Sequence, residues 1–150
     1  MHSYKTDSSK ETQKIAAGLA KKFLRAKTKR KNALVFALMG ELGSGKTTFV
    51  QGFLRGLGIK KKITSPTFVI AKNYKLKTKN YKQAYHIDCY RIKKADELLK
   101  LGLREVLENP QNIVLIEWAE KIKKILPKNF VWLKFKHGPK ENIRVIRLNS

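Results

Sequence analysis

Residues 40–47 read GELGSGKT and match the phosphate-binding pattern G-x-x-x-x-G-K-[ST] at every position. Glycines in such a loop let backbone N–H groups surround phosphate oxygens, and the positive end of the following helix strengthens the attraction. Lys46 would reach the β- and γ-phosphates of a nucleotide, and Thr47 would offer a hydroxyl ligand to Mg²⁺. The alternative is that the glycines only form a turn before a helix, but a turn does not require Lys and Thr at positions 46 and 47. The loop therefore predicts binding of a nucleoside triphosphate with magnesium.

Two carboxylates are candidates for completing this site. Glu117 ends the apolar run 113–116, so it would emerge at the carboxyl edge of a parallel sheet, where the loop also lies. Alternatively, Glu117 is a carboxylate at the end of a strand with no role in the site. Asp88 lies in a second predicted strand and could bind Mg²⁺ through water or orient the attacking water. Alternatively, Asp88 only pairs with Arg91 or a lysine.

Three other residues near these motifs have open roles. Strand alternation places His86 on the face of Asp88, but a lone histidine of this kind is interpreted as structural. Trp118 could shield the site or offer a stacking surface, although a buried indole is the interpretation we favour from the residues alone. Thr67 follows Ser-Pro, which is typical of a turn, and could equally contact the γ-phosphate or the metal as part of a switch.

The elements that must position these residues form an alternating pattern. Runs 33–39 and 113–116 are apolar without alternation, which is typical of strands buried on both faces of a parallel sheet. Residues 75–82 (KLKTKNYK) are predicted to join two strands as a hairpin. A first helix is expected to begin at a capping box, residues 8–11, and to end at about residue 27. Further helices are expected at 46–55, 96–101 and 103–108. Strands are expected at 33–39, 68–74, 83–89, 113–116, 130–135 and 143–148. We expect one α/β domain over residues 1–150, P-loop NTPase-like, with a mostly parallel central sheet flanked by helices and an antiparallel hairpin portion.

Composition narrows the class of protein. The 150 residues include 34 Lys+Arg against 11 Asp+Glu, a net charge of +23, which favours an anionic partner such as a nucleotide, nucleic acid or membrane surface. Most of these cations are lysines spread along the chain, and a generally lysine-rich composition explains that spread equally well. The lone Cys89 excludes an internal disulfide, and no zinc-ligand spacing is present. No apolar run approaches the roughly 20 residues of a membrane span. We expect a cytoplasmic protein without a membrane partner.

Four motifs together, GELGSGKTTF, SPTF, YHIDCYR and IEW, resemble the bacterial TsaE family in order and spacing. That family is the small P-loop ATPase of tRNA threonylcarbamoyladenosine synthesis, and the resemblance extends from about Ser8 through Trp118. It implies ATP and Mg²⁺ as cofactors and TsaB- and TsaD-like proteins as partners, which modify adenosine 37 of tRNA. Contact with tRNA itself would be indirect or weak. ATP would act as an assembly or conformational switch.

The resemblance also assigns residues. Catalytic roles fall to Lys46, Asp88 and Glu117, and Mg²⁺ would be bound by Thr47 and Glu117. One departure is Ala119, where many relatives carry proline, and we expect it to affect the stiffness of the loop more than its chemistry. The nucleotide contacts implied are Ser9, Glu41, Leu42, Gly43, Ser44, Gly45, Lys46, Thr47, Thr48, Thr67, Asp88, Trp118 and Arg144.

Two other functions remain open from the residues alone. A nucleotide or small-molecule kinase shares the loop, but the long segment 72–82 is lysine-rich rather than an arginine-rich lid. A tRNA-binding module is consistent with the charge, because Tyr74, Tyr81 and Tyr85 among lysines could stack on bases. The guanine-reading N-K-x-D motif is absent, which disfavours a GTPase. For the ATPase we expect slow intrinsic turnover, since no arginine is obviously placed to neutralise the transition state.

Overall fold

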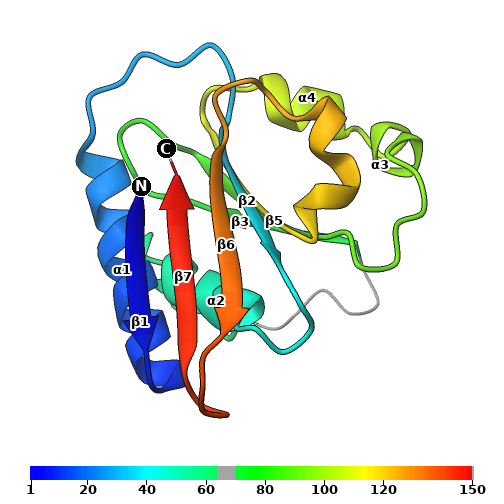
Figure 1. The fold of residues 1–150 in the computed structure, drawn as a ribbon. Coiled ribbons are helices and arrows are strands. Elements are labelled where there is room, and N and C mark those ends of the chain that lie inside the picture. Colours follow the sequence, from blue (N-terminus) through cyan, green and yellow to red (C-terminus); the bar gives the residue numbers. More distant parts are fainter. Residues whose placement is uncertain (64–69, 150) are drawn as a thin grey trace.

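A mixed seven-stranded sheet forms the centre of the molecule, with helices on both faces (Figure 1). The structure is a computed structural model and describes residues 1–63 and 70–149. The strands, in the spatial order β1-β7-β6-β2-β5-β4-β3, are β1 (His2–Thr6), β2 (Leu34–Gly40), β3 (Ala71–Lys75), β4 (Gln83–Asp88), β5 (Asn112–Glu117), β6 (Val131–His137) and β7 (Arg144–Asn149). The helices are α1 (Ser9–Arg25), α2 (Lys46–Gly56), α3 (Asp96–Leu99), α4 (Leu103–Glu108) and the 3₁₀ helix η1 (Ala119–Ile125).

The sheet is parallel in the middle and antiparallel at both margins. Strands β6, β2, β5 and β4 run parallel, as expected for an α/β protein. Strand β3 pairs antiparallel with β4, which confirms the predicted hairpin, and β7 lies antiparallel between β6 and β1. The second antiparallel margin makes the sheet less parallel than expected. The single α/β domain is confirmed.

The predicted elements are found with small shifts at their ends, and two were missed. Strand β1 is short and polar, and its pairing partner β7 lies almost a chain length away, so nothing local predicts it. The 3₁₀ helix η1 was also not expected. The predicted strand 68–74 is observed as β3, and its first two positions, like Ser65, Pro66 and Thr67, lie outside the described residues.

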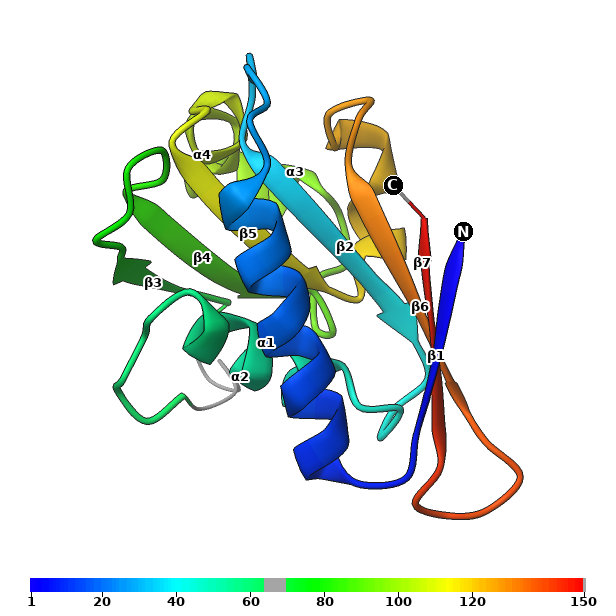
Figure 2. The same ribbon diagram turned by 90° about the vertical axis from the view of Figure 1, so that its left-hand side faces the viewer.

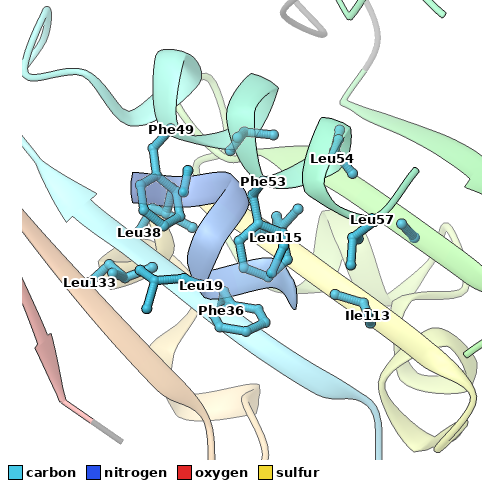
Figure 3. Close-up of a cluster of buried hydrophobic side chains, with 14 of the residues drawn as sticks. Leu19, Phe36, Leu38, Phe49, Phe53, Leu54, Leu57, Ile113, Leu115 and Leu133 are labelled. Carbon is cyan, nitrogen blue, oxygen red and sulfur yellow. The ribbon is translucent and has the colours of Figure 1, made fainter. Parts of the chain in front are cut away.

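Helices α1 and α2 cover one face of the sheet (Figure 2). The α1 N-cap is Ser8, whose hydroxyl accepts the Glu11 N–H at 3.2 Å, while the Glu11 carboxylate accepts the Asp7 N–H at 2.8 Å. Beneath the two helices, aromatic and aliphatic side chains form a continuous core (Figure 3). The ring of Phe36 on β2 lies 4.6 Å from that of Phe53 on α2. This packing fixes α2, and with it the loop that precedes it, against the sheet.

Helices α3, α4 and η1 cover the other face, where a second core forms around β2, β4 and β5. These helices lie mainly over the β4-β5-β2 part of the sheet, and β6 contacts their core through the half-buried Trp132. Strands β1 and β7 extend beyond the helices (Figure 1). In the described part of the chain, no helix is both long and apolar enough to cross a membrane.

Three parallel strands end at the same edge of the sheet. Strand β2 ends at Gly40, β4 at Asp88 and β5 at Glu117, and Asp88 is the register partner of Glu117. Because the carboxyl ends of parallel strands are where α/β proteins place their ligands, this edge is where a site is expected.

Candidate functional site

A cleft of about 680 Å³ lies at this edge, within the size range of small-molecule sites. It is lined by Ser8, Ser9, Thr12, Leu42, Gly43, Ser44, Gly45, Lys46, Thr47, Thr48, Ile70, Asp88, Tyr90, Arg91, Glu117, Trp118, Asn142 and Arg144. All but two of the sequence-predicted site residues are therefore brought together. Glu41 does not line the cleft, and Thr67 lies outside the described residues.

The glycine-rich loop (residues 40–47) is shaped by close approach and by backbone geometry. A Cβ on Gly40 would lie 2.5 Å from the Phe135 carbonyl oxygen, so a side chain cannot be accommodated where β2 ends beside β6. Gly45 has φ +100° and caps α2, a left-handed conformation that glycine adopts without strain. The first turn of α2, with its free N–H groups, therefore faces the cleft.

Lys46, the first residue of α2, is only 5% exposed. Its Nζ donates to the carbonyl oxygens of Gly40 at 2.6 Å and Glu41 at 2.8 Å, and it lies 4.2 Å from the centre of the Trp118 ring. Burial lowers the pKa of Lys46, and the carboxylates of Glu117, Glu120 and Asp88 oppose that effect. The ammonium is thus held mainly by neutral carbonyl groups of the loop, which an anion could replace as its partner.

Thr47 and Glu117 meet at the centre of the cleft. The Thr47 hydroxyl donates to Glu117 Oε1 at 2.7 Å, and Glu117 is 2% exposed. Its other oxygen, Oε2, lies 2.5 Å from His86 Nε2. His86 is fully buried, and its Nδ1 has no hydrogen-bond partner in the described part of the chain. The histidine interpreted from the sequence as structural therefore contacts the candidate metal carboxylate directly.

Asp88 and Trp118 line the cleft beside this pair. Asp88 Oδ1 accepts the Tyr90 N–H at 2.9 Å. Burial raises the pKa of Asp88, the Tyr90 hydrogen bond lowers it, and the Glu117 charge raises it further. Trp118 is half-buried: it packs on Tyr90 with ring centres 5.1 Å apart and against the edge of the second core, and it also lines the cleft. The fully buried indole favoured from the residues alone is therefore not observed. The Trp118 φ of +56° is unusual for a residue with a bulky side chain.

Both ends of the described sequence contribute residues to the lining of the cleft or to contacts with its loop. Arg144 on β7 donates from Nε to the Gly43 carbonyl at 3.2 Å, and His137 Nε2 lies 3.2 Å from the Leu42 carbonyl oxygen. Ser9 lines the cleft from the start of α1. Six further lining residues were not assigned to the site from the sequence: Ser8, Thr12, Ile70, Tyr90, Arg91 and Asn142. Of these, Tyr90 and Arg91 lie in the YHIDCYR motif and Ser8 begins the predicted capping box, so the sequence carried a signal for them.

The donors in this cleft fit a magnesium nucleotide. Mg²⁺ usually keeps several waters and takes one or two carboxylates together with phosphate oxygens. The Thr47 hydroxyl and the Glu117 carboxylate are oxygen donors in contact with each other, and Lys46 and the start of α2 supply positive potential for phosphates. Among residues 1–63 and 70–149, no cluster of three or more His, Cys, Asp or Glu could hold a metal by itself.

Known proteins similar to this chain point to one family. The family model for the threonylcarbamoyl adenosine biosynthesis protein TsaE matches residues 6–146. The tRNA threonylcarbamoyladenosine biosynthesis protein TsaE of Haemophilus influenzae is 40% identical over 95 residues, which cover 63% of this chain and 58% of that protein. The TsaE protein of Bacillus subtilis is 45% identical over 93 residues, covering 62% and 55%, and that of Rickettsia typhi is 40% identical over 121 residues, covering 80% and 76%.

A solved structure agrees over nearly the whole chain. The crystal structure of YdiB from Bacillus subtilis aligns with a TM-score of 0.72 and 32% identity, covering 97% of this chain and 82% of that one. By sequence, the matched part of the chain spans little more than half the length of the Haemophilus influenzae and Bacillus subtilis relatives.

Proposed function

This chain belongs to the TsaE family, and we propose that it binds and slowly hydrolyses ATP with Mg²⁺ in support of tRNA threonylcarbamoyladenosine biosynthesis. The observation that carries the proposal is the contact between Thr47 and Glu117, 2.7 Å apart, one residue from the buried Lys46. The Thr47 hydroxyl at the start of α2 and the Glu117 carboxylate at the end of β5 are oxygen donors of the kind that Mg²⁺ takes together with phosphate oxygens. We infer a P-loop NTPase-like fold from the order of buried strand, glycine-rich loop and helix α2.

Each residue has a distinct role in this proposal. Lys46 would exchange its loop carbonyls for β- and γ-phosphate oxygens, as the first N–H groups of α2 bind phosphate alongside it. Thr47 and Glu117 would hold Mg²⁺, which neutralises the charge that develops on the phosphates. Asp88, with its carboxylate beside Glu117, would orient the attacking water. Trp118 would cover Lys46 and exclude bulk water.

Slow turnover follows from the arginines near the cleft. The Arg144 guanidinium donates from Nε to the Gly43 carbonyl and from Nη1 to those of Glu141 and Ile143, so these two nitrogens are engaged by the chain itself. Arg91 lines the cleft but is exposed to solvent. Arginines that neutralise a phosphoryl-transfer transition state contribute several orders of magnitude in rate. We therefore expect TsaB- and TsaD-like partners to complete or order the site, with the ATP state controlling assembly.

Calorimetric titration with ATP, with and without Mg²⁺, tests the site. Lys46→Ala should weaken ATP binding under both conditions. Thr47→Ala and Glu117→Gln should lose the Mg²⁺-dependent part of the affinity and retain the rest. Thr28→Ala, an exposed threonine far from the cleft, is the matched control and should behave as wild type. If Thr47→Ala and Glu117→Gln kept the full Mg²⁺ effect, the metal assignment would be wrong.

A second experiment addresses the pathway role. TsaB- and TsaD-like proteins would be co-purified with the wild type and with Glu117→Ala, with and without ATP and Mg²⁺. We expect the complex to depend on nucleotide and to respond to the substitution. A complex indifferent to both would refute the switch, and rapid ATP turnover by the isolated protein would refute the need for a partner.

A further inference from the structure

The second antiparallel margin of the sheet presents an uncovered cationic face. Strands β1, β7 and β6 contain no acidic residue. Most of their apolar side chains, among them Tyr4, Leu133 and Ile146, join the core beneath α1 and α2. On the opposite face, β6 meets the second core through Trp132, whereas no described helix covers β1 and β7, as Figure 1 shows. This surface is hereafter the open face, defined by Lys5, Lys134, Lys136 and Arg147.

Strand register brings the four cations of the open face together. Lys134 is the register partner of Arg147, and in the next row Lys136 and Lys5 flank Val145. All four cationic side chains are exposed, whereas Val145 and Trp132 on the same face are half-buried. Rows two residues apart on a strand are separated by roughly 6.6–6.8 Å, and adjacent strands by about 4.8 Å. Four like charges therefore lie within about one Debye length of a neighbour, and their mutual repulsion is relieved by a bound polyanion.

The composition of the open face favours a nucleic acid over an acidic protein as its partner. Protein–protein interfaces are depleted in lysine at their cores and enriched in aromatic residues, whereas this face has three exposed lysines and one half-buried tryptophan. Lysine and arginine on a flat, open surface are typical of contacts to the phosphates of nucleic acid, which position a partner without reading its sequence. None of the four residues lines the nucleotide cleft, so the face is separate from the ATP site.

We propose that the open face binds the phosphate backbone of RNA, with Lys5, Lys134, Lys136 and Arg147 as its contacts. The choice of tRNA as that RNA rests on the proposed function, whereas the cationic face does not. The face meets the cleft through β7, because Arg144 at one end of this strand holds the glycine-rich loop and Arg147 lies three residues further on. RNA bound there would lie beside the nucleotide site without entering it.

The test measures the affinity for an unmodified tRNA transcript at several salt concentrations. In the open-face variant, Lys5, Lys134, Lys136 and Arg147 are all changed to Gln. Each phosphate contact contributes about 0.7–0.9 to the slope of log affinity against log salt, so we expect the slope to fall by about three. A matched control variant removes the same charge from four exposed lysines near β3 and α3, by changing Lys75, Lys77, Lys79 and Lys93 to Gln. Its slope should fall by less than about one.

Two further measurements separate the possible outcomes. A charge-preserving variant, with Lys5, Lys134 and Lys136 changed to Arg and Arg147 to Lys, should bind tRNA as wild type does, which excludes damage to the strands. ATP turnover should be the same in the open-face variant as in the wild type. If the protein did not hydrolyse ATP at all, the turnover assay would show it, and the tRNA-binding result would be unaffected. Equal losses in the open-face and control variants would overturn the proposal. It would also be overturned if the open-face variant kept tRNA binding but lost capture of TsaB- and TsaD-like proteins, which would assign the face to a protein.

Discussion

Two helical glycines should respond to the same substitution in opposite directions. Gly18 lies in α1 with nothing within 4 Å of the place a methyl group would occupy, so Gly18→Ala adds only helix propensity. That change is expected to stabilise the protein by about 0.5–1 kcal/mol. Gly52 lies in α2 against α1, where a Cβ would meet the Cα and carbonyl oxygen of Gln13, each at 2.4 Å. Backbone atoms cannot rotate away, so the two helices would have to separate.

The size of the Gly52→Ala effect follows from these contacts. Overpacking of a tight core costs about 1–3 kcal/mol, and contacts this close place the cost at the upper end. The gain in helix propensity offsets about 1 kcal/mol, which leaves a loss of about 2 kcal/mol. Because 1 kcal/mol corresponds to about 2–4 °C for a chain of this size, the gain of about 0.5–1 kcal/mol in Gly18→Ala should raise Tm by about 1–4 °C. Gly52→Ala should lower it by about 4–8 °C.

Thermal unfolding followed by circular dichroism measures both variants against wild type. The two substitutions are chemically identical and change the unfolded chain equally, so their difference reports on the folded state alone. An increase in Tm for Gly52→Ala equal to that of Gly18→Ala would refute the close approach of α1 and α2. Without that close approach, the rigid placement of Lys46 and Thr47 at the start of α2 would lose its physical basis.

His86→Phe should leave Glu117 Oε2 buried without its partner, which should lower the free energy of unfolding by about 1–3 kcal/mol. In a titration with ATP present, the same variant should bind Mg²⁺ about 10–100-fold more weakly. His86→Gln should recover part of both losses. Unchanged Mg²⁺ affinity in His86→Phe would show that this histidine does not position Glu117. Burial raises the pKa of Cys89 from 9.0 to about 12, so above pH 9 the unfolded chain loses a proton that the folded protein keeps. In urea unfolding, the free energy of unfolding of the wild type should therefore fall relative to that of Cys89→Ala by about 1.4 kcal/mol per pH unit between pH 9 and 12. If the free energies of the two proteins changed in parallel over this pH range, the burial of the thiol would be contradicted.

The residues that sequence reasoning identified are those whose signal is local. The glycine-rich loop and the apolar run ending at Glu117 each carry their information within a few positions, and the structure brings both to one cleft. The alternation of β4 placed His86 on the correct face, but its contact with Glu117 depends on the register between β4 and β5. That register is a property of the assembled sheet.

Other features depend on residues far apart in the sequence. Strand β1 forms because β7 offers it a pairing edge, and its five polar-leaning residues have no strand signal of their own. Thr12 and Asn142 enter the cleft only because α1 and the β6–β7 turn are brought to the same edge of the sheet. Arg144 was assigned by resemblance, and no spacing within this chain would have selected it from the other arginines.

The pairing of β1 with β7 has a consequence for synthesis of the protein. On the ribosome β1 is made first, and its only strand neighbour in the described sheet is made after the glycine-rich loop, α2 and the whole parallel core. Until β7 emerges, the segment before α1 has no edge to join, and the loop lacks the Arg144 contact that holds Gly43. The cleft is thus the part of the molecule completed late in translation. A nascent chain in which β7 has not yet emerged from the ribosome should therefore lack a finished nucleotide site, even where the parallel strands have already paired.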